Sequence, residues 1–173
     1  YIAEKLMRKY VLTEHLSFSD LKLFIMDVDG VLTDGGMYYS ENGDELKKFN
    51  TTDGKGIELL RKSGIKTAII TSENTKIIDN RAEKLNIDYI YKGIRDKLKI
   101  AKKICEVEKI SLNNVAFIGD DINDINLLKK VKLKACPSDA QEEVKKVNGI
   151  KVMNKEGGRG AVREFVNHLI YIE

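Results

Sequence analysis

The sequence predicts an α/β fold, a Rossmann-like, doubly wound parallel sheet. Short apolar runs of strand length alternate with segments of helical periodicity, as a parallel sheet covered by crossover helices requires. Several of these runs end in carboxylates or hydroxyls, and such sheets bind ligands where the carboxyl ends of the strands lie. The runs occur near residues 21–26, 65–70, 89–91, 114–118, 132–135 and 149–152.

The composition fits one domain and argues against two classes of partner. A chain of 173 residues with 42% hydrophobic content is long enough to bury one continuous core. Its 30 basic and 27 acidic residues are interspersed without a basic stripe, so we expect no nucleic-acid partner. No apolar run approaches the ~18 residues of a membrane span, so we expect no membrane partner. Cys105 and Cys136 form no CxxC, which favours reduced thiols in a cytoplasmic protein.

The first twenty residues are set apart from this domain. Apolar residues recur between Ile2 and Leu16 near helical spacing, which predicts an amphipathic helix outside the sheet or the tail of a linker from a preceding domain. The chain begins at Tyr1 rather than Met, and further sequence upstream is compatible with either interpretation. We therefore expect a helical leader or linker over residues 1–20 and the main domain over residues 21–173.

The first strand ends in two carboxylates. Residues 21–26 form a nearly continuous apolar run, as a strand buried on both faces needs, and Asp27 and Asp29 follow it one residue apart. Gly30 then allows the chain to turn. Because Asp-x-Asp-Gly also occurs in calcium loops and ordinary turns, this motif alone does not decide the function.

A β-hairpin is expected next. Two strand-like pieces lie within residues 36–49 around Asn42-Gly43, which is a strong hairpin signal. The hairpin emerges at the sheet edge that carries the two carboxylates and is placed to cover a site in its own or a neighbouring subunit. The polar residues 50–54 follow, with Thr52 or Asp53 as a candidate N-cap for a helix over residues 56–62.

The second strand, residues 65–70, also ends in polar residues. Thr71, Ser72 and Glu73 precede a helix that we expect from about residue 75 to 85, and each hydroxyl either caps this helix or helps to bind an anion at its start. After a short strand, Lys97 lies at the start of another helix that runs to about residue 107. A cation is disfavoured there by the helix dipole, so Lys97 suggests a functional role.

Three carboxylates follow the strand at residues 114–118. Asp120, Asp121 and Asp124 lie within five residues of one another, with Asn123 between them. Such groups repel one another unless a cation is bound, and Mg²⁺ prefers oxygen ligands of this kind. Further along, we expect a helix over residues 138–147. A glycine-rich segment around Arg159 then either delivers a mobile cation to a phosphate or sugar acid or forms an ordinary loop before a last helix that ends near residue 170.

The order of the four polar clusters resembles that of the haloacid dehalogenase superfamily of phosphohydrolases. Its motifs are an Asp-x-Asp strand end, a Ser or Thr, a Lys and a late acidic cluster, and the resemblance spans about residues 21–170. Only a hairpin-sized insert follows the first motif, so we expect no separate cap domain. The chain looks like the capless branch of 3-deoxy-D-manno-octulosonate 8-phosphate and nonulosonate 9-phosphate phosphatases. The segments that carry this narrower resemblance are residues 27–35, 49–54, 81–83 and 157–164.

The resemblance implies a Mg²⁺-dependent phosphomonoester hydrolase that works through an aspartyl-phosphate. Asp27 would be the nucleophile and Asp29 the general acid and base, with Thr71 and Lys97 at the phosphoryl group. Asp27, the Asp29 carbonyl and Asp120 would hold Mg²⁺. Asp121, Asn123 and Asp124 would support these groups by orienting the metal-bound waters and Lys97.

The resemblance also implies the substrate and the assembly. The substrate would be a small sugar-acid phosphate, and the protein would form a homotetramer in which a neighbouring subunit helps to close the site. The chain has Ser72 where glycine is usual and Glu73 where octulosonate phosphatases carry arginine, which favours a nine-carbon sugar. Glu73 and Arg81 are expected on one helix face toward a neighbour's substrate. The expected substrate-binding residues are Asn50, Thr51, Thr52, Asp53, Gly54, Ser72, Glu73, Arg81 and Arg159.

Two other interpretations belong to different classes. One is a catalytically weak or inactive assembly domain, similar to modules fused behind sugar-acid cytidylyltransferases, and the presence of both Asp27 and Asp29 argues against it. The other is a response-regulator-like receiver with an acidic Mg²⁺ pocket. A receiver would need neither Asp29 for turnover nor the late acidic cluster around Asp120.

Overall fold

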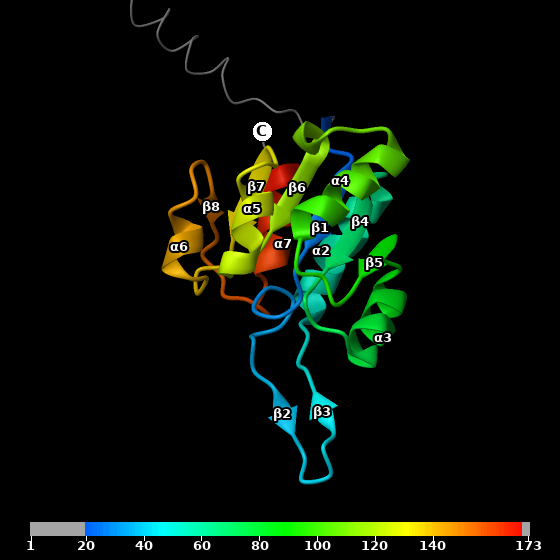
Figure 1. Ribbon diagram of the computed structural model, residues 1–173, viewed down its shortest axis with the longest axis vertical. Helices are drawn as coiled ribbons and strands as arrows, with labels where there is room; N and C mark the ends of the chain where they lie inside the picture. The colour runs from blue at the N-terminus through cyan, green and yellow to red at the C-terminus, as the bar shows by residue number, and fades with distance from the viewer. Residues whose placement is uncertain (1–19, 171–173) are drawn as a thin grey trace, which may run out of the picture.

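A computed structural model describes residues 20–170 as a six-stranded sheet covered on both faces by helices (Figure 1). The strand order is β5-β4-β1-β6-β7-β8, and each neighbouring pair is parallel. The strands are β1 (Leu23–Met26), β4 (Lys66–Ile70), β5 (Tyr89–Tyr91), β6 (Val115–Ile118), β7 (Leu133–Cys136) and β8 (Lys151–Val152). The predicted doubly wound α/β class is confirmed.

Two hydrophobic cores lie on opposite faces of the sheet. In β1, Phe24 and Met26 face one core and Leu23 and Ile25 face the other, because successive side chains of a strand point to opposite sides. The first core is closed by α2 (Thr51–Lys62), α3 (Lys76–Leu85) and α7 (Ala161–Ile170). The second is closed by α4 (Lys97–Glu108), α5 (Ile125–Leu128) and α6 (Glu142–Lys145). Short 3₁₀ turns, η2 (Leu112–Asn114) and η3 (Ile122–Asp124), precede β6 and α5.

Some predicted helix boundaries were wrong. Helix α2 begins at Thr51 rather than Gly56, because Asn50 is its N-cap: the Asn50 side chain accepts a hydrogen bond from the Thr52 amide at 2.8 Å. Helix α3 begins at Lys76, within one residue of the predicted start, and Glu73 lies in the preceding loop. The helix expected over residues 138–147 is the single turn of α6.

The predicted hairpin is present and projects away from the body of the molecule (Figure 1). It consists of β2 (Tyr38–Tyr39) and β3 (Glu45–Leu46), which pair in antiparallel register. Its sheet partners are only each other, so the hairpin is a separate two-stranded unit. Within residues 20–170 it is the sole insert between β1 and α2, and no separate cap domain occurs in this part of the chain.

The predicted leader or linker over residues 1–20 lies outside the described residues apart from Asp20, so its structure and the domain boundary stay predictions. Among the helices of residues 20–170, none is both long and apolar enough to cross a membrane.

Candidate active site

Polar side chains from two neighbouring strands and one helix converge at the carboxyl edge of the sheet. Asp27 follows β1, Asp120 and Asp124 follow β6, and Lys97 is the first residue of α4. Strand β1 lies between β4 and β6 in the sheet, so the loops that follow these strands are adjacent. Each carboxylate of Asp27, Asp120 and Asp124 has an oxygen within 4.8 Å of the other two. Four of the residues predicted from the sequence are thus brought together.

Lys97 joins two of these carboxylates through a buried ammonium group. Its Nζ lies 2.8 Å from Oδ2 of Asp27 and 2.6 Å from Oδ1 of Asp124, and the Lys97 side chain has no exposed surface. Burial opposes the charge, but the two carboxylates outweigh this effect and raise the pKa of Lys97 above its ordinary value. Lys97 therefore carries a fixed positive charge beside Asp27, which explains its unfavourable place at a helix start.

Two of the four polar residues that follow β6 face the site, and the other two face away from it. Asp124 is fully buried, and its Oδ2 accepts hydrogen bonds from the amides of Asp120 (2.9 Å) and Asp121 (3.3 Å). The Asp121 side chain instead accepts from the Ile122 amide at 2.6 Å and caps the turn η3, and Asn123 is exposed. Asp120 and Asp124 therefore face the site, whereas Asp121 acts at a distance through its charge.

The electrostatics of Asp27 and Asp120 favour a bound cation. Burial and then repulsion by Asp124 raise the pKa of Asp27 to about 7, although Lys97 lowers it. Burial and the neighbouring carboxylates, Asp27 first, raise the pKa of Asp120 to about 8. Oδ1 of Asp120 is buried and has no hydrogen-bond partner, which is costly unless a ligand occupies the position. A hard dication fits this donor set, since it would relieve the repulsion and satisfy the orphaned oxygen.

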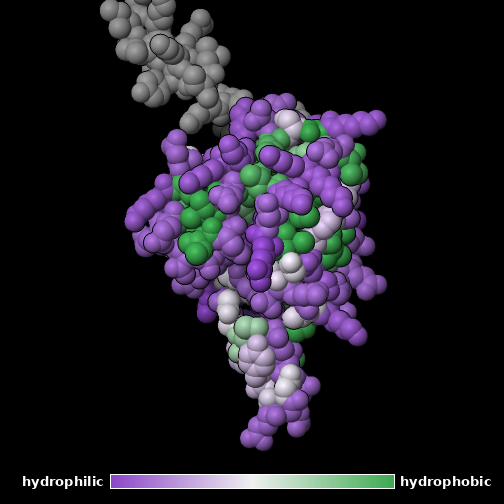
Figure 2. Space-filling view, viewed as in Figure 1, coloured by the Kyte–Doolittle hydropathy of each residue, from purple (hydrophilic) through white to green (hydrophobic). Residues whose placement is uncertain are grey.

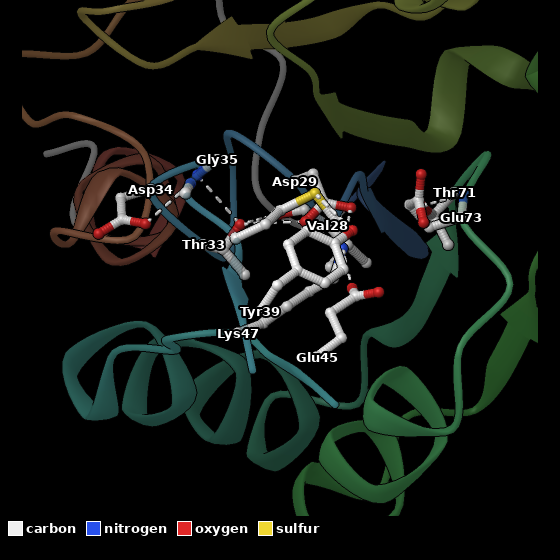
Figure 3. Close-up of polar contacts among 12 residues, drawn as sticks. Val28, Asp29, Thr33, Asp34, Gly35, Tyr39, Glu45, Lys47, Thr71 and Glu73 are labelled. Atoms are coloured by element: carbon white, nitrogen blue, oxygen red, sulfur yellow. Dashed lines mark hydrogen bonds and ion pairs between the residues drawn. The ribbon is translucent and has the colours of Figure 1, made fainter. Parts of the chain in front are cut away.

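Asp29 is contacted by a lysine of the hairpin segment (Figure 3). Nζ of Lys47 lies 2.7 and 2.8 Å from the two carboxylate oxygens of Asp29, and the Thr33 hydroxyl donates to Oδ1 at 3.3 Å. Burial opposes the charge of Lys47, but its hydrogen bond with Asp29 prevails and raises the pKa of the lysine. Sequence reasoning missed Lys47; the signal available was its place just after the second hairpin strand, which returns toward the Asp-x-Asp motif.

Thr71 lies at the carboxyl end of a core strand, and its contact with a phosphoryl group stays a prediction. It follows β4 and is buried, and its Oγ1 accepts a hydrogen bond from the Glu73 amide at 3.2 Å. Its hydroxyl caps this local turn and does not cap α3, whose N-cap is Thr75. Ser72 is exposed and Glu73 is partly exposed. Of Thr71, Ser72 and Glu73, Thr71 is thus the residue that is buried.

The start of α2 is tied to the start of α7. Asp53 is buried and accepts hydrogen bonds from the amides of Gly160 (3.2 Å) and Arg163 (3.0 Å), so it caps α7 rather than α2. Burial raises the pKa of Asp53, and these backbone hydrogen bonds oppose the rise. Thr51 and Thr52 are exposed, and Gly54 lies beside Arg81 and Leu85. Asp53 therefore has a structural partner in addition to its predicted place near the substrate.

The arrangement expected for Glu73 and Arg81 was wrong. Glu73 is not on α3, so the two residues do not share a helix face. Arg81 points inward instead: its Nη2 donates to the Asn50 carbonyl at 3.0 Å, and its guanidinium lies over the Phe49 ring at 5.3 Å. Arg159, in contrast, is exposed and pairs with Glu156 on the same turn at 3.0 Å.

The glycine-rich segment is packed against the Asp-x-Asp turn. A Cβ atom on Gly157 would lie 1.9 Å from the carbonyl oxygen of Gly30, so only glycine permits this approach. The Gly158 amide donates to the Val31 carbonyl at 2.9 Å, and its own carbonyl accepts from Asn50 Nδ2 at 3.1 Å. The segment is thus a packed loop, and a contact of Arg159 with a phosphate or sugar acid stays a prediction.

Comparison with known proteins places the chain in a family. A profile of the haloacid dehalogenase-like hydrolases matches residues 89–160. The 3-deoxy-D-manno-octulosonate 8-phosphate phosphatase of Escherichia coli K12 is 40% identical over 151 residues, which cover 87% of this chain and 80% of that protein. The crystal structure of the Yersinia pestis phosphatase of the same name has a TM-score of 0.85 at 37% identity and covers 88% of this chain and 82% of that one.

A third relative was solved with ligands. The structure of the same phosphatase from Moraxella catarrhalis, in complex with a magnesium ion, a phosphate ion and a KDO molecule, has a TM-score of 0.85 at 36% identity. It covers 88% of this chain and 87% of that one. With the fold and the converging site residues described above, these matches establish the relationship. The chain belongs to the haloacid dehalogenase-like hydrolases, within the family of 3-deoxy-D-manno-octulosonate 8-phosphate phosphatases.

Proposed function

We propose that this protein is a Mg²⁺-dependent phosphatase of a 3-deoxy-ulosonate phosphate and works through an aspartyl-phosphate on Asp27. The observation that carries the proposal is the pairing of Asp27 with a buried, charged Lys97 beside the unsatisfied oxygen of Asp120. The family relationship and the sugar acid in the Moraxella catarrhalis structure support the substrate class. Because Asp27, Asp29 and Lys97 are all in place, the inactive assembly domain is not favoured.

In the first half-reaction, an oxygen of Asp27 attacks phosphorus as the bond from phosphorus to the sugar oxygen breaks. Asp29 gives a proton to the leaving sugar oxygen. In the second half-reaction, Asp29 takes a proton from a water molecule as the oxygen of that water attacks phosphorus. The bond between phosphorus and the Asp27 oxygen breaks at the same time, and its electron pair returns to the Asp27 carboxylate. The Asp29 side chain is 28% exposed, so substrate and water can reach it, as both steps require.

The remaining groups neutralise charge. Lys97 and the Thr71 hydroxyl are assigned to the equatorial phosphoryl oxygens, where negative charge is greatest in the transition state. We assign Asp27, the Asp29 carbonyl and Asp120 to Mg²⁺, which when bound reduces the repulsion between the phosphate dianion and the carboxylates. Asp124 holds Lys97 in position through the buried ion pair. Asp121 and Asn123 are assigned to the waters around the ion.

Mg²⁺ is expected to stabilise the fold more at pH 8 than at pH 5. The pKa values of Asp27 and Asp120 are raised from 3.8 to about 7 and about 8, so the native metal-free protein retains protons that the unfolded chain releases. Its stability therefore falls as the pH rises through this range. At low pH those protons compete with the ion. At Mg²⁺ about 100-fold above its dissociation constant, the gain is about 2.7 kcal/mol, measured by thermal or urea unfolding.

Asp120→Asn is the matched variant for this experiment. It removes one of the charges assigned to the metal and keeps the size of the side chain, so its stabilisation by Mg²⁺ should require a higher concentration. An equal response in the two proteins, or the same response at both pH values, would contradict the assignment.

The carbon number of the substrate is tested with two sugar phosphates. The relatives' names support octulosonate 8-phosphate, whereas Glu73 favours a nonulosonate 9-phosphate. The carboxylate of Glu73 acts electrostatically on Lys47, which contacts Asp29, and it is suited to accept hydrogen bonds from hydroxyl or amide groups of the sugar. We expect Glu73→Arg to shift the ratio of kcat/KM values toward octulosonate 8-phosphate by about tenfold or more. An unchanged ratio would exclude Glu73 as a specificity residue.

We also propose that four copies assemble. Met37, Tyr38, Tyr39 and Leu46 of the hairpin are 41–66% exposed, and Figure 2 shows pale and light-green residues along the projecting hairpin above its purple tip. Such apolar side chains on a projecting hairpin are suited to contact another subunit, which would also cover a capless site. Light scattering should show a tetramer, and Leu46→Glu should lower the mass. Val107→Glu, at an equally exposed position of α4, is the control. A wild-type monomer at working concentration would contradict this proposal.

A cytoplasmic location completes the proposal. It is supported by Cys105 and Cys136, both buried and free, as reduced thiols in a biosynthetic enzyme would be.

A further inference from the structure

Lys47 connects the hairpin to the proposed general acid and base. Lys47 follows β3 immediately. Its Nζ donates hydrogen bonds to both carboxylate oxygens of Asp29, which lies 18 residues earlier in the chain. The Lys47 side chain has no exposed surface, so this ammonium is removed from water at the expense of its hydration. Among the described residues, Lys47 is the cation that forms an ion pair with Asp29.

We propose that Lys47 is a positioning residue that fixes the carboxylate of Asp29 for the hydrolysis of the aspartyl-phosphate. The inference rests on the proposed function and adds a residue to it. The contact is charge-assisted, and one ammonium group donates to both oxygens, so it is stronger than a hydrogen bond between neutral groups. Thr33 donates to the same Oδ1 from the neighbouring turn, so two donors on different segments determine the plane of the carboxylate.

The position of Lys47 is itself constrained. Oε1 of Glu45 lies 3.6 Å from its Nζ, and Glu73 acts on it electrostatically from the loop after β4. Figure 3 shows Lys47 and Glu45 side by side on the hairpin with Asp29 above them. The hairpin therefore delivers the charge to Asp29 from one side and leaves the solvent-exposed part of the carboxylate available to a water molecule.

The two half-reactions depend differently on this orientation. An aryl phosphate with a good leaving group needs no proton from Asp29 in the first step, so phosphorylation of Asp27 proceeds without it. The second step needs Asp29 to accept a proton from the attacking water as the bond from phosphorus to Asp27 breaks. General base catalysis of this kind contributes about 10²–10⁴-fold, and a mobile carboxylate loses part of that contribution.

The test is rapid-mixing kinetics with para-nitrophenyl phosphate and Mg²⁺. In Lys47→Met we expect a burst of nitrophenolate at the wild-type rate, followed by steady-state turnover about 10–100-fold slower, with phosphorylated enzyme accumulating. Lys47→Arg should restore part of the turnover, because arginine also pairs with both oxygens. Lys48→Met removes the next lysine, which is exposed and pairs only with Asp34 at 3.6 Å, and should behave as the wild type.

Several outcomes overturn the inference. A loss of the burst in proportion to turnover would show general structural damage. A raised KM with unchanged kcat would show a substrate contact. Wild-type kinetics in Lys47→Met would show no role. If Lys47→Met does not fold, the same measurements on Lys47→Gln decide.

A double variant separates action through Asp29 from every other effect. In an Asp29→Asn background, Lys47→Met should cause no further loss of turnover, because the group on which Lys47 acts is already absent. Additive losses would refute the inference. Failure of the proposed function looks different, since the wild-type protein itself would then show no Mg²⁺-dependent release of phosphate.

Discussion

The Asp27→Asn variant is expected to lose phosphatase activity by about 10⁴-fold or more while it keeps its fold. An amide oxygen does not form the aspartyl-phosphate, so the first half-reaction stops. The fold should persist, because burial and repulsion by Asp124 already raise the pKa of Asp27 to about 7, and a neutral amide relieves that repulsion. Initial rates with octulosonate 8-phosphate and a thermal unfolding curve without Mg²⁺ provide the two measurements.

Asp79→Asn is the control for this substitution. Asp79 lies on α3 and pairs with Lys92, away from the site, so its amide variant should retain the wild-type rate. Comparable rates in Asp27→Asn and the wild type would show that another group is the nucleophile.

Lys97→Met is expected to abolish activity and to destabilise the metal-free protein by about 3–5 kcal/mol at pH 8. Removal of the ammonium leaves Asp27 and Asp124 buried without their cation, and methionine fills the space without supplying charge. Lys97 lowers the pKa of Asp27, so its loss raises that pKa further. The carboxyl is then protonated more readily, and the destabilisation should shrink as the pH falls below about 7.

Urea unfolding at pH 8 and pH 5 measures this difference. Lys103→Met, on the exposed face of the same helix α4, should change the free energy of unfolding little at either pH. If Lys97→Met lowered the free energy of unfolding equally at the two pH values, loss of the ion pairs would not explain the destabilisation.

The sequence was sufficient for the parts of the site that follow directly from strand ends. Asp27 was predictable because an apolar run with strand composition stops at it, and Asp120 because a later buried run, residues 114–118, ends two residues before it. Lys97 was identified by its conflict with the helix dipole. In each case the local pattern agrees with the position that the sheet requires, so no distant contact was needed for the prediction.

Other parts of the site depend on contacts that the sequence does not show. Arg81 was expected to share a helix face with Glu73, but its guanidinium packs over the Phe49 ring and donates to the Asn50 carbonyl. Glu73 was placed on α3, but Thr71 Oγ1 accepts its amide hydrogen bond and holds it in the preceding loop. Lys47 was missed because its role appears only when the hairpin folds back onto Asp29.

The most direct test of the account is the detection of a phosphoryl group on Asp27 during turnover. The protein is mixed with Mg²⁺ and a 3-deoxy-ulosonate phosphate, quenched in acid within the first turnovers, digested and analysed by mass spectrometry. The account predicts one phosphorylated peptide, with the group on Asp27, and none in Asp27→Asn. Turnover of the substrate with no phosphorylated Asp27 in the wild type or in the slow Asp29→Asn variant would contradict it.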